Sequence, residues 1–186
     1  MWLNAGHSDE LSQGDLLRDI PFPKLKLGLQ TLEVATKPHS VIELQIQPAI
    51  VVTQDCIIDK EHVRHIALAP IRPEGGLNQA QVDAIWAPEP PTEGVGDLSG
   101  YVYDYFAVNE HSELPKSPPN GLLVSDLKRI QPFEGPREDF VNRRVARMAV
   151  ESVRLLRINL ASFWGRPSEE HAEQLEQLGI PPGIVP

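Results

Sequence analysis

The sequence predicts a single domain of the α+β class that is mainly β, with one long amphipathic helix near its C-terminal end. Apolar and polar residues alternate from Lys24 to Glu33, which is the period-two pattern of a half-buried strand. The segment Pro48–Thr53 is dense in β-branched residues, which indicates a strand buried on both faces. Residues 138–164 contain no proline or glycine and place apolar residues at helical spacing, which predicts a helix of about seven turns.

Length and composition narrow the class of protein. The 186 residues suffice for one domain with a core but not for two ordinary domains and a linker, and 18 prolines with 13 glycines predict prominent loops. Cys56 is the single cysteine, which excludes an internal disulfide, and no run approaches the roughly 20 apolar residues of a membrane-spanning helix. With no recognisable leader segment, we expect a cytoplasmic protein without membrane contact. The net charge of −9 argues against unspecific binding to phosphates.

The other elements follow from the same periodicities and from the prolines that interrupt them. Residues 1–13 hold few apolar side chains and are expected to form a flexible lead-in. Leu16, Leu17 and Ile20 predict a first short strand that Pro21 and Pro23 end, because proline supplies no ladder donor. Further strands are expected at residues 41–46, 65–71 and 101–108, and residues 122–130 are expected to form a final strand or a turn. A short helix is expected at 77–86, and loops at 87–100 and 110–121.

The predicted long helix at 138–164 carries its charge unevenly. Its apolar side chains fall on one face, and the opposite face gathers four arginines, namely Arg143, Arg147, Arg154 and Arg157. We expect this basic face to contact phosphates or an acidic protein; the alternative is an ordinary solvated face. The main domain is assigned to residues 14–167, and residues 168–186 to a short helix, N-capped by Ser168, and a proline-rich tail.

Three segments in order resemble the PemK/MazF-like toxin family. They are Gly14-Asp15, then Gln47–Thr53 (QPAIVVT), then Ala67–Ile71 (ALAPI). The family opens its first strand with Gly-Asp, places Arg-Pro before a valine-rich strand, and follows it with an Ala-Pro-Ile/Leu segment. The resemblance covers residues 14–71 and, more weakly, residues 122–133. It implies a small SH3-like barrel, usually dimeric, that cleaves single-stranded messenger RNA and is neutralised by an antitoxin peptide.

The resemblance also implies where the chemistry would lie. The family relies on an arginine before the Pro-Val strand and on a serine or threonine after the Ala-Pro segment, and here these positions hold Gln47 and Arg72. A neutral amide cannot replace a guanidinium that stabilises charge in the transition state. We therefore expect the family's usual ribonuclease activity to be missing. The alternative is an endoribonuclease in which Arg72 supplies the cation, with Thr53 or Gln54 beside it.

The loop after the valine-rich strand displays polar groups where binding residues are often found. It carries Gln54, Asp55 and Cys56 directly after the predicted buried strand. A nucleophilic Cys56 would need a base such as His62 or His65, and the alternative is a small cysteine that packs in the core.

Two further patterns could indicate function but are also typical of residues with a purely structural role. Cys56, Asp59, His62 and His65 recur every third residue, but this spacing matches no zinc signature, and we expect no metal and no cofactor. The row of Tyr101, Tyr103 and Tyr105 could stack on bases, although packing across strands is the commoner role of such a row.

These observations predict an interaction module built on a PemK/MazF-like barrel, in a bacterial or phage toxin-antitoxin or defence-like system. The expected partner is a protein or a single-stranded RNA, and the apolar helix face could serve a homodimer or the domain's own core. The alternative function is the active endoribonuclease with Arg72 as its cationic group.

Overall fold

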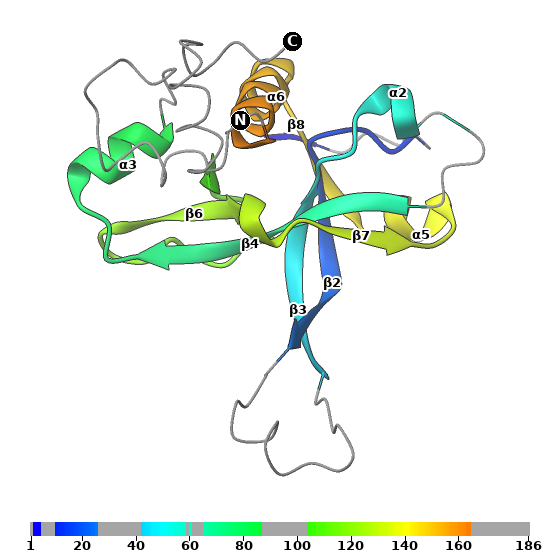
Figure 1. Cartoon of the computed structure of the whole chain (residues 1–186), viewed down its shortest axis with the longest axis horizontal. Helices are drawn as coiled ribbons and strands as arrows, with labels where there is room; N and C mark the ends of the chain where they lie inside the picture. The colour runs from blue at the N-terminus through cyan, green and yellow to red at the C-terminus, as the bar shows by residue number, and fades with distance from the viewer. Residues whose placement is uncertain are drawn as a thin grey trace, which may run out of the picture.

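The computed structural model describes residues 2–4, 10–25, 42–58, 60, 65–86 and 104–164 (Figure 1). The strands are β1 Trp2–Asn4, β2 Asp15–Leu25, β3 Ile42–Val51, β4 His65–Gly75, β5 Tyr105–Val108, β6 Gly121–Asp126, β7 Gln131–Glu134 and β8 Arg144–Met148. The helices are α2 Asp55–Ile58, α3 Gln79–Trp86, the 3₁₀ turn η1 Leu127–Arg129, α5 Arg137–Val141 and α6 Val150–Trp164.

The strands form an antiparallel sheet in the order β1-β8-β2-β3-β4-β6-β5, and β7 pairs with the first part of β4. The α+β, mainly β class is therefore confirmed. The long strand β4 holds the sheet together, because it pairs with β7 and β3 through its first half and with β6 from Ile71 onward. Among the described residues β1 and β5 are the two ends of this order, so the strands do not close into the SH3-like barrel that the resemblance implied.

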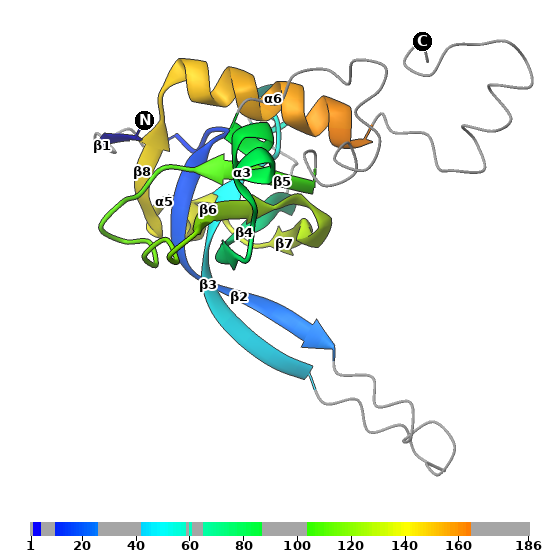
Figure 2. The same cartoon turned by 90° about the vertical axis from the view of Figure 1, so that its left-hand side faces the viewer.

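The core lies between the curved sheet and α6, which crosses above the strands in Figure 2. Leu156 and Leu160 of α6 pack with Ile50 of β3 and Met148 of β8 in one buried cluster. A second cluster lies under α5 and contains Phe22, whose ring meets that of Phe133 edge-on at 5.1 Å between centroids. The short helix predicted at 77–86 is confirmed as α3, which covers β5 and β6 in a third cluster.

The prediction of a single helix at residues 138–164 is wrong. The segment folds as the short helix α5, the strand β8 and the 15-residue helix α6. β8 pairs with both β1 and β2, so a strand is selected here by partners more than a hundred residues away in the sequence. The lack of proline and glycine permits a helix, but it does not exclude a strand once a sheet edge and a buried charge partner are present.

Two other expectations for the N-terminal part are corrected. Within the predicted lead-in, residues 2–4 form β1 against β8, and Leu11 and Gln13 are buried. β2 does not end at Pro21 and Pro23 but continues to Leu25, paired with β3. Residues 26–33 of the predicted second strand, residues 101–103 and the terminal helix after Ser168 lie outside the described residues.

β2 and β3 extend from the body as a two-stranded arm, visible in both Figure 1 and Figure 2. The strands pair from Ile20 opposite Gln47 to Leu25 opposite Ile42. Arg18 and Asp19 interrupt the ladder just before the arm, and Asp19 has a φ of 56°, as expected at a β-bulge that turns the strand. The arm thus begins where β2 stops pairing with β8 and β3 stops pairing with β4.

Candidate functional site

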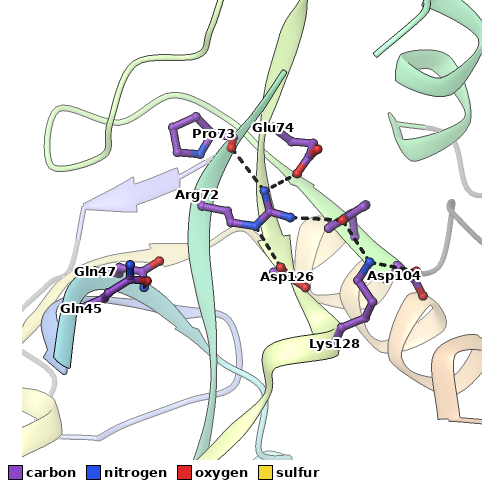
Figure 3. Close-up of polar contacts among 9 residues, drawn as sticks. Gln45, Gln47, Arg72, Pro73, Glu74, Asp104, Asp126 and Lys128 are labelled. Carbon is purple, nitrogen blue, oxygen red and sulfur yellow. Dashed lines mark hydrogen bonds and ion pairs between the residues drawn. The ribbon is translucent and has the colours of Figure 1, made fainter. Parts of the chain in front are cut away.

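Arg72, which the sequence placed at a family catalytic position, lies in a polar cluster on β4, β5 and β6 (Figure 3). Its Nε donates to Asp126 Oδ2 at 2.9 Å, and its Nη2 donates to the hydroxyl of Tyr105 at 3.1 Å. Its Nη1 forms an ion pair with Glu74. The guanidinium is thus held by two carboxylates and a phenol.

Strand pairing explains why these side chains meet. Arg72 lies opposite Val124 of β6, and Tyr105 of β5 lies opposite Asp126, so Arg72, Asp126 and Tyr105 face the same side of the sheet. Glu74 is two residues beyond Arg72 on β4 and shares its face. The alternation of the strands therefore builds the cluster without any loop.

Lys128 completes the cluster from η1. Its Nζ donates to the Tyr105 hydroxyl at 3.1 Å and pairs with Asp104 Oδ2 at 3.3 Å. The Tyr105 ring also lies 5.3 Å from the Arg72 guanidinium carbon and 4.7 Å from Lys128 Nζ, within cation–π range. Two cations and three carboxylates therefore surround one aromatic ring.

The electrostatics of the cluster favour the charged forms of its cations. Partial burial works to lower the pKa of Arg72, but its hydrogen bond to Asp126 and the nearby Glu74 outweigh this and raise it. Burial likewise opposes the charge on Lys128, and the contacts with Tyr105 and Asp104 leave its pKa raised. The Asp126 side chain is only 4% exposed, and its Oδ1 finds no hydrogen-bond partner among the described residues, so the bond to Arg72 is its main compensation.

Gln47 lies apart from Arg72. Figure 3 shows the Arg72 guanidinium turned toward β6, away from Gln47 and Gln45. Gln47 Nε2 donates to Gln45 Oε1 at 3.3 Å on the arm. Gln47 also lines a polar pocket of about 180 Å³ together with Arg18, Asp19, Ile46, Pro48 and Glu113. The structure therefore brings Gln47 together with Arg18 and not with Arg72.

Thr53 has a structural contact of its own. Its hydroxyl accepts a hydrogen bond of 2.7 Å from the backbone N–H of Ala67, which joins the end of β3 to β4. Gln54 and Cys56 lie on the exposed turn at α2, with Cys56 Sγ 3.7 Å from Gln54 Oε1. Of the two bases suggested for Cys56, His62 lies outside the described residues and His65 is an exposed residue at the start of β4. Asp59 also lies outside the described residues.

Asp55 and Arg157 belong to a second polar network, which ties α2 and α6 to the segment before β2. Arg157 donates to Asp55 Oδ2 and to Gln13 Oε1, each at 2.7 Å. Gln13 is buried, and its backbone N–H donates to Asp55 Oδ1 at 2.7 Å. This network holds the lead-in against the body.

Arg147 lies at the centre of the adjoining contacts. Its Nε donates to Asp15 Oδ1 at 2.7 Å and its Nη2 to Asp15 Oδ2 at 3.1 Å, a bidentate pair with a fully buried carboxylate. The hydrogen bonds to Asp15 raise the pKa of Arg147, against the opposing effect of burial. Arg144 also reaches Asp15 Oδ2, at 3.4 Å.

The four arginines predicted on one basic face are therefore separated. Arg147 is on β8 and pairs inward with Asp15, and Arg143 follows α5 and donates to the backbone oxygen of Asp19 at 2.6 Å. Arg154 and Arg157 alone lie on α6, and Arg157 is paired with Asp55.

Sequence reasoning did not single out Gln13 and Asp126, and it named Asp15 and Tyr105 without linking either to an arginine. Asp15, Gln13, Asp126 and Tyr105 are the residues on which the two networks depend. Asp15 stood in the recognised Gly-Asp pair, but its partner Arg147 is 132 residues away in the sequence. No local pattern links such residues, because their contact depends on the pairing of β2 with β8.

The described part of the chain holds neither a cluster of metal-ligand side chains nor a membrane-spanning helix. There, no three His, Cys, Asp or Glu side chains gather into a group able to hold a metal ion. Among the same residues no helix combines the length and apolar character needed to cross a bilayer.

Comparison with known proteins adds no assignment. No protein-family model matches the chain, and no curated protein matches its sequence. The likeness to the PemK/MazF family consequently rests on the three short segments at residues 14–15, 47–53 and 67–71. Membership of that family stays a prediction.

Proposed function

We propose that this chain is a non-catalytic protein-interaction module of the PemK/MazF-like type, without the family's ribonuclease activity. The observation that carries the proposal is the pairing of Arg72 with Asp126, Glu74 and Tyr105. Arg72 was the only cation that the sequence offered at the two family positions, since the other holds Gln47. A guanidinium already held by two carboxylates is poorly suited to stabilise the charge of a phosphorane.

The distribution of charge favours a protein partner over a nucleic acid. Arg72, Arg147 and Arg157 each form ion pairs with carboxylates of the same chain. The overall charge of −9 repels phosphates at long range. A binding surface for RNA would need several exposed cations together, and the four arginines expected to provide one are distributed over β8, α6 and the turn after α5.

Exposed apolar side chains support the same choice. Leu44 and Ile46 lie on the arm, and Val150, Leu155 and Ile158 lie on the outer side of α6. Apolar groups gathered on an exposed surface are a common feature of protein-binding sites. The setting that fits the resemblance is a cytoplasmic toxin-antitoxin or defence-like system of a bacterium or phage.

A second candidate function is RNA binding at the Gln47 pocket. Arg18, which is exposed, lines this pocket together with Gln47, and a cation beside a neutral amide can bind a phosphate. Asp19 and Glu113 lie in the same lining and oppose the binding of an anion. This balance makes RNA binding the weaker of the two proposals.

The experiment incubates purified protein with a mixed single-stranded RNA beside Gln47→Arg and Arg18→Ala variants. We expect no cleavage by the parent on a denaturing gel, and no salt-sensitive binding in fluorescence anisotropy. Cleavage by the parent would reject the proposal. Tight binding that falls with salt and is lost in Arg18→Ala would replace it with the RNA-binding function.

A further inference from the structure

The two edges of the arm differ in their capacity to accept another strand. Between Ile20 and Leu25 β2 pairs only with β3, and between Ile42 and Gln47 β3 pairs only with β2, among the residues that the structure describes. The arm is therefore a two-stranded ribbon with two outer edges. Exposed strand edges template the addition of further strands unless they are blocked.

Prolines block the outer edge of β2. Pro21 lies opposite Ile46 and Pro23 opposite Leu44. A proline nitrogen cannot donate to the ladder, so these two positions must direct their nitrogens away from β3. The outer edge of β2 thus lacks the backbone donor at two of its three outward positions, since Leu25, opposite Ile42, is the third.

The same geometry opens the outer edge of β3. Because the pairs Pro21–Ile46 and Pro23–Leu44 exchange no hydrogen bonds, the N–H and C=O groups of Leu44 and Ile46 also point outward. No proline or lysine protects β3 between Ile42 and Gln47. The side chains of Leu44 and Ile46 are 60% and 61% exposed, so this edge presents outward backbone groups beside apolar side chains.

We propose that two copies of this chain dimerise by antiparallel pairing of their β3 edges, with the two-fold axis at Leu44. In this register Leu44 lies opposite Leu44 of the second copy, and Ile46 lies opposite Ile42. The outward groups at positions 42, 44 and 46 then all find partners, and the two arms form one four-stranded sheet.

Two features of the sequence favour a second copy as the occupant. The outward positions 42, 44 and 46 are symmetric about Leu44 and end before Pro48, which lacks the next donor. With the axis at Leu44, Glu43 lies opposite Gln45 of the second copy, so no like charges meet. A shift of the axis to Glu43 would place two carboxylates opposite each other, which is destabilising. An axis at Gln45 would also bring no like charges together, but position 42 would then lie opposite Pro48, which has no N–H to donate. The register centred on Leu44 is therefore the one that pairs all three outward positions.

The first experiment measures the mass of the full chain by sedimentation over a range of concentrations. We expect a concentration-dependent dimer. Leu44→Pro should abolish it without disturbing the ribbon, because the Leu44 N–H points away from β2 in the same way as the nitrogens of Pro21 and Pro23. The matched control Leu44→Val keeps the backbone donor and should remain dimeric. If Leu44→Pro does not fold, Leu44→Lys replaces it, since two lysines would then meet at the axis.

The second experiment uses oxidative cross-linking. It is done in a Cys56→Ser background, because the exposed thiol of Cys56 could itself form a disulfide. Leu44→Cys should form an intermolecular disulfide, since residues opposite each other in a hydrogen-bonded antiparallel pair have Cα atoms about 5.5 Å apart. Lys24→Cys is the matched control, on the exposed part of β2, and should stay reduced.

A monomer at every concentration overturns the proposal. A dimer that persists in both Leu44→Pro and Leu44→Lys overturns it as well, since its interface must then lie elsewhere. Neither outcome depends on the RNA assays, so the dimer and the proposed function fail separately.

Discussion

The carboxylate of Asp15 on β2 is fully buried and accepts two hydrogen bonds from the guanidinium of Arg147 on β8. Ser12 also donates its backbone N–H to Asp15 Oδ2 at 2.8 Å. The pair therefore joins the first long strand to the last strand and fixes the lead-in at the same point. It also accounts for an arginine that the sequence had placed on a basic helix face.

Asp15→Asn should lower the stability of the fold strongly. The substitution keeps the size of the side chain but removes the charge that Arg147 and Arg144 both contact. Breaking one side of a buried ion pair costs about 3–5 kcal/mol, so we expect a loss of this size in the free energy of unfolding. Urea denaturation measures it.

Arg154→Ala is the matched control for that substitution. Arg154 lies on α6 and is exposed, so its removal should change stability by no more than about 0.5 kcal/mol. Equal losses in the two variants would contradict a special role for the Asp15–Arg147 pair.

Gly14→Ala should be more destabilising than Gly76→Ala. Both glycines have positive φ, 86° and 75°, so both substitutions carry the strain of an unfavourable backbone conformation. A Cβ on Gly14 would also lie 2.8 Å from Val153 Cγ2 and 3.3 Å from Met148 Cβ, whereas one on Gly76 meets nothing within 4 Å. The difference in thermal midpoint between the two variants reports the effect of the clash alone. We expect Gly14→Ala to lose about 1–3 kcal/mol more unfolding free energy than Gly76→Ala. A smaller loss at Gly14 than at Gly76 would contradict the packing of α6 on this turn.

Lys128 should stabilise the fold at neutral pH and lose this effect in strong alkali. Burial lowers the pKa of Lys128, but the contacts with Tyr105 and Asp104 raise it above its ordinary 10.5 in the folded state. The stabilisation is complete below the unfolded-state pKa and is lost as pH rises through the higher folded-state value.

The measurement compares the unfolding free energies of the parent and Lys128→Met as a function of pH. The advantage of the parent should stay constant below pH 10.5 and shrink above it. An advantage that grows with alkaline pH would show that the folded-state pKa is lowered, contrary to the contacts of Lys128.

Local patterns in the sequence predicted the centre of the fold. The β-branched run predicted at residues 48–53 overlaps the end of β3, which stops at Val51, and the strand predicted at 65–71 lies in β4. The helix predicted at 77–86 is α3. In these segments burial and periodicity act in the same direction, so no distant partner is needed to choose the structure.

Strand β8, the prolines within β2 and the cluster around Arg72 could not be predicted from local patterns, because they depend on long-range contacts. Val145 and Met148 suit a helix by spacing, but pairing with β2 and the charge of Asp15 select a strand. Pro21 and Pro23 are tolerated in β2 because their nitrogens face the outer edge. The cluster around Arg72 was equally hidden, since Tyr105 and Asp126 meet it only through the order of β4, β6 and β5.

The central claim, that Arg72 holds the fold together and does not catalyse, is tested most directly by Arg72→Met. The account predicts a fall of about 3–5 kcal/mol in the free energy of unfolding, because Asp126 loses its cation while buried. It also predicts that the parent cleaves no single-stranded RNA, so the variant has no activity to lose. Cleavage by the parent that disappears in an Arg72→Met variant of unchanged stability would contradict the account.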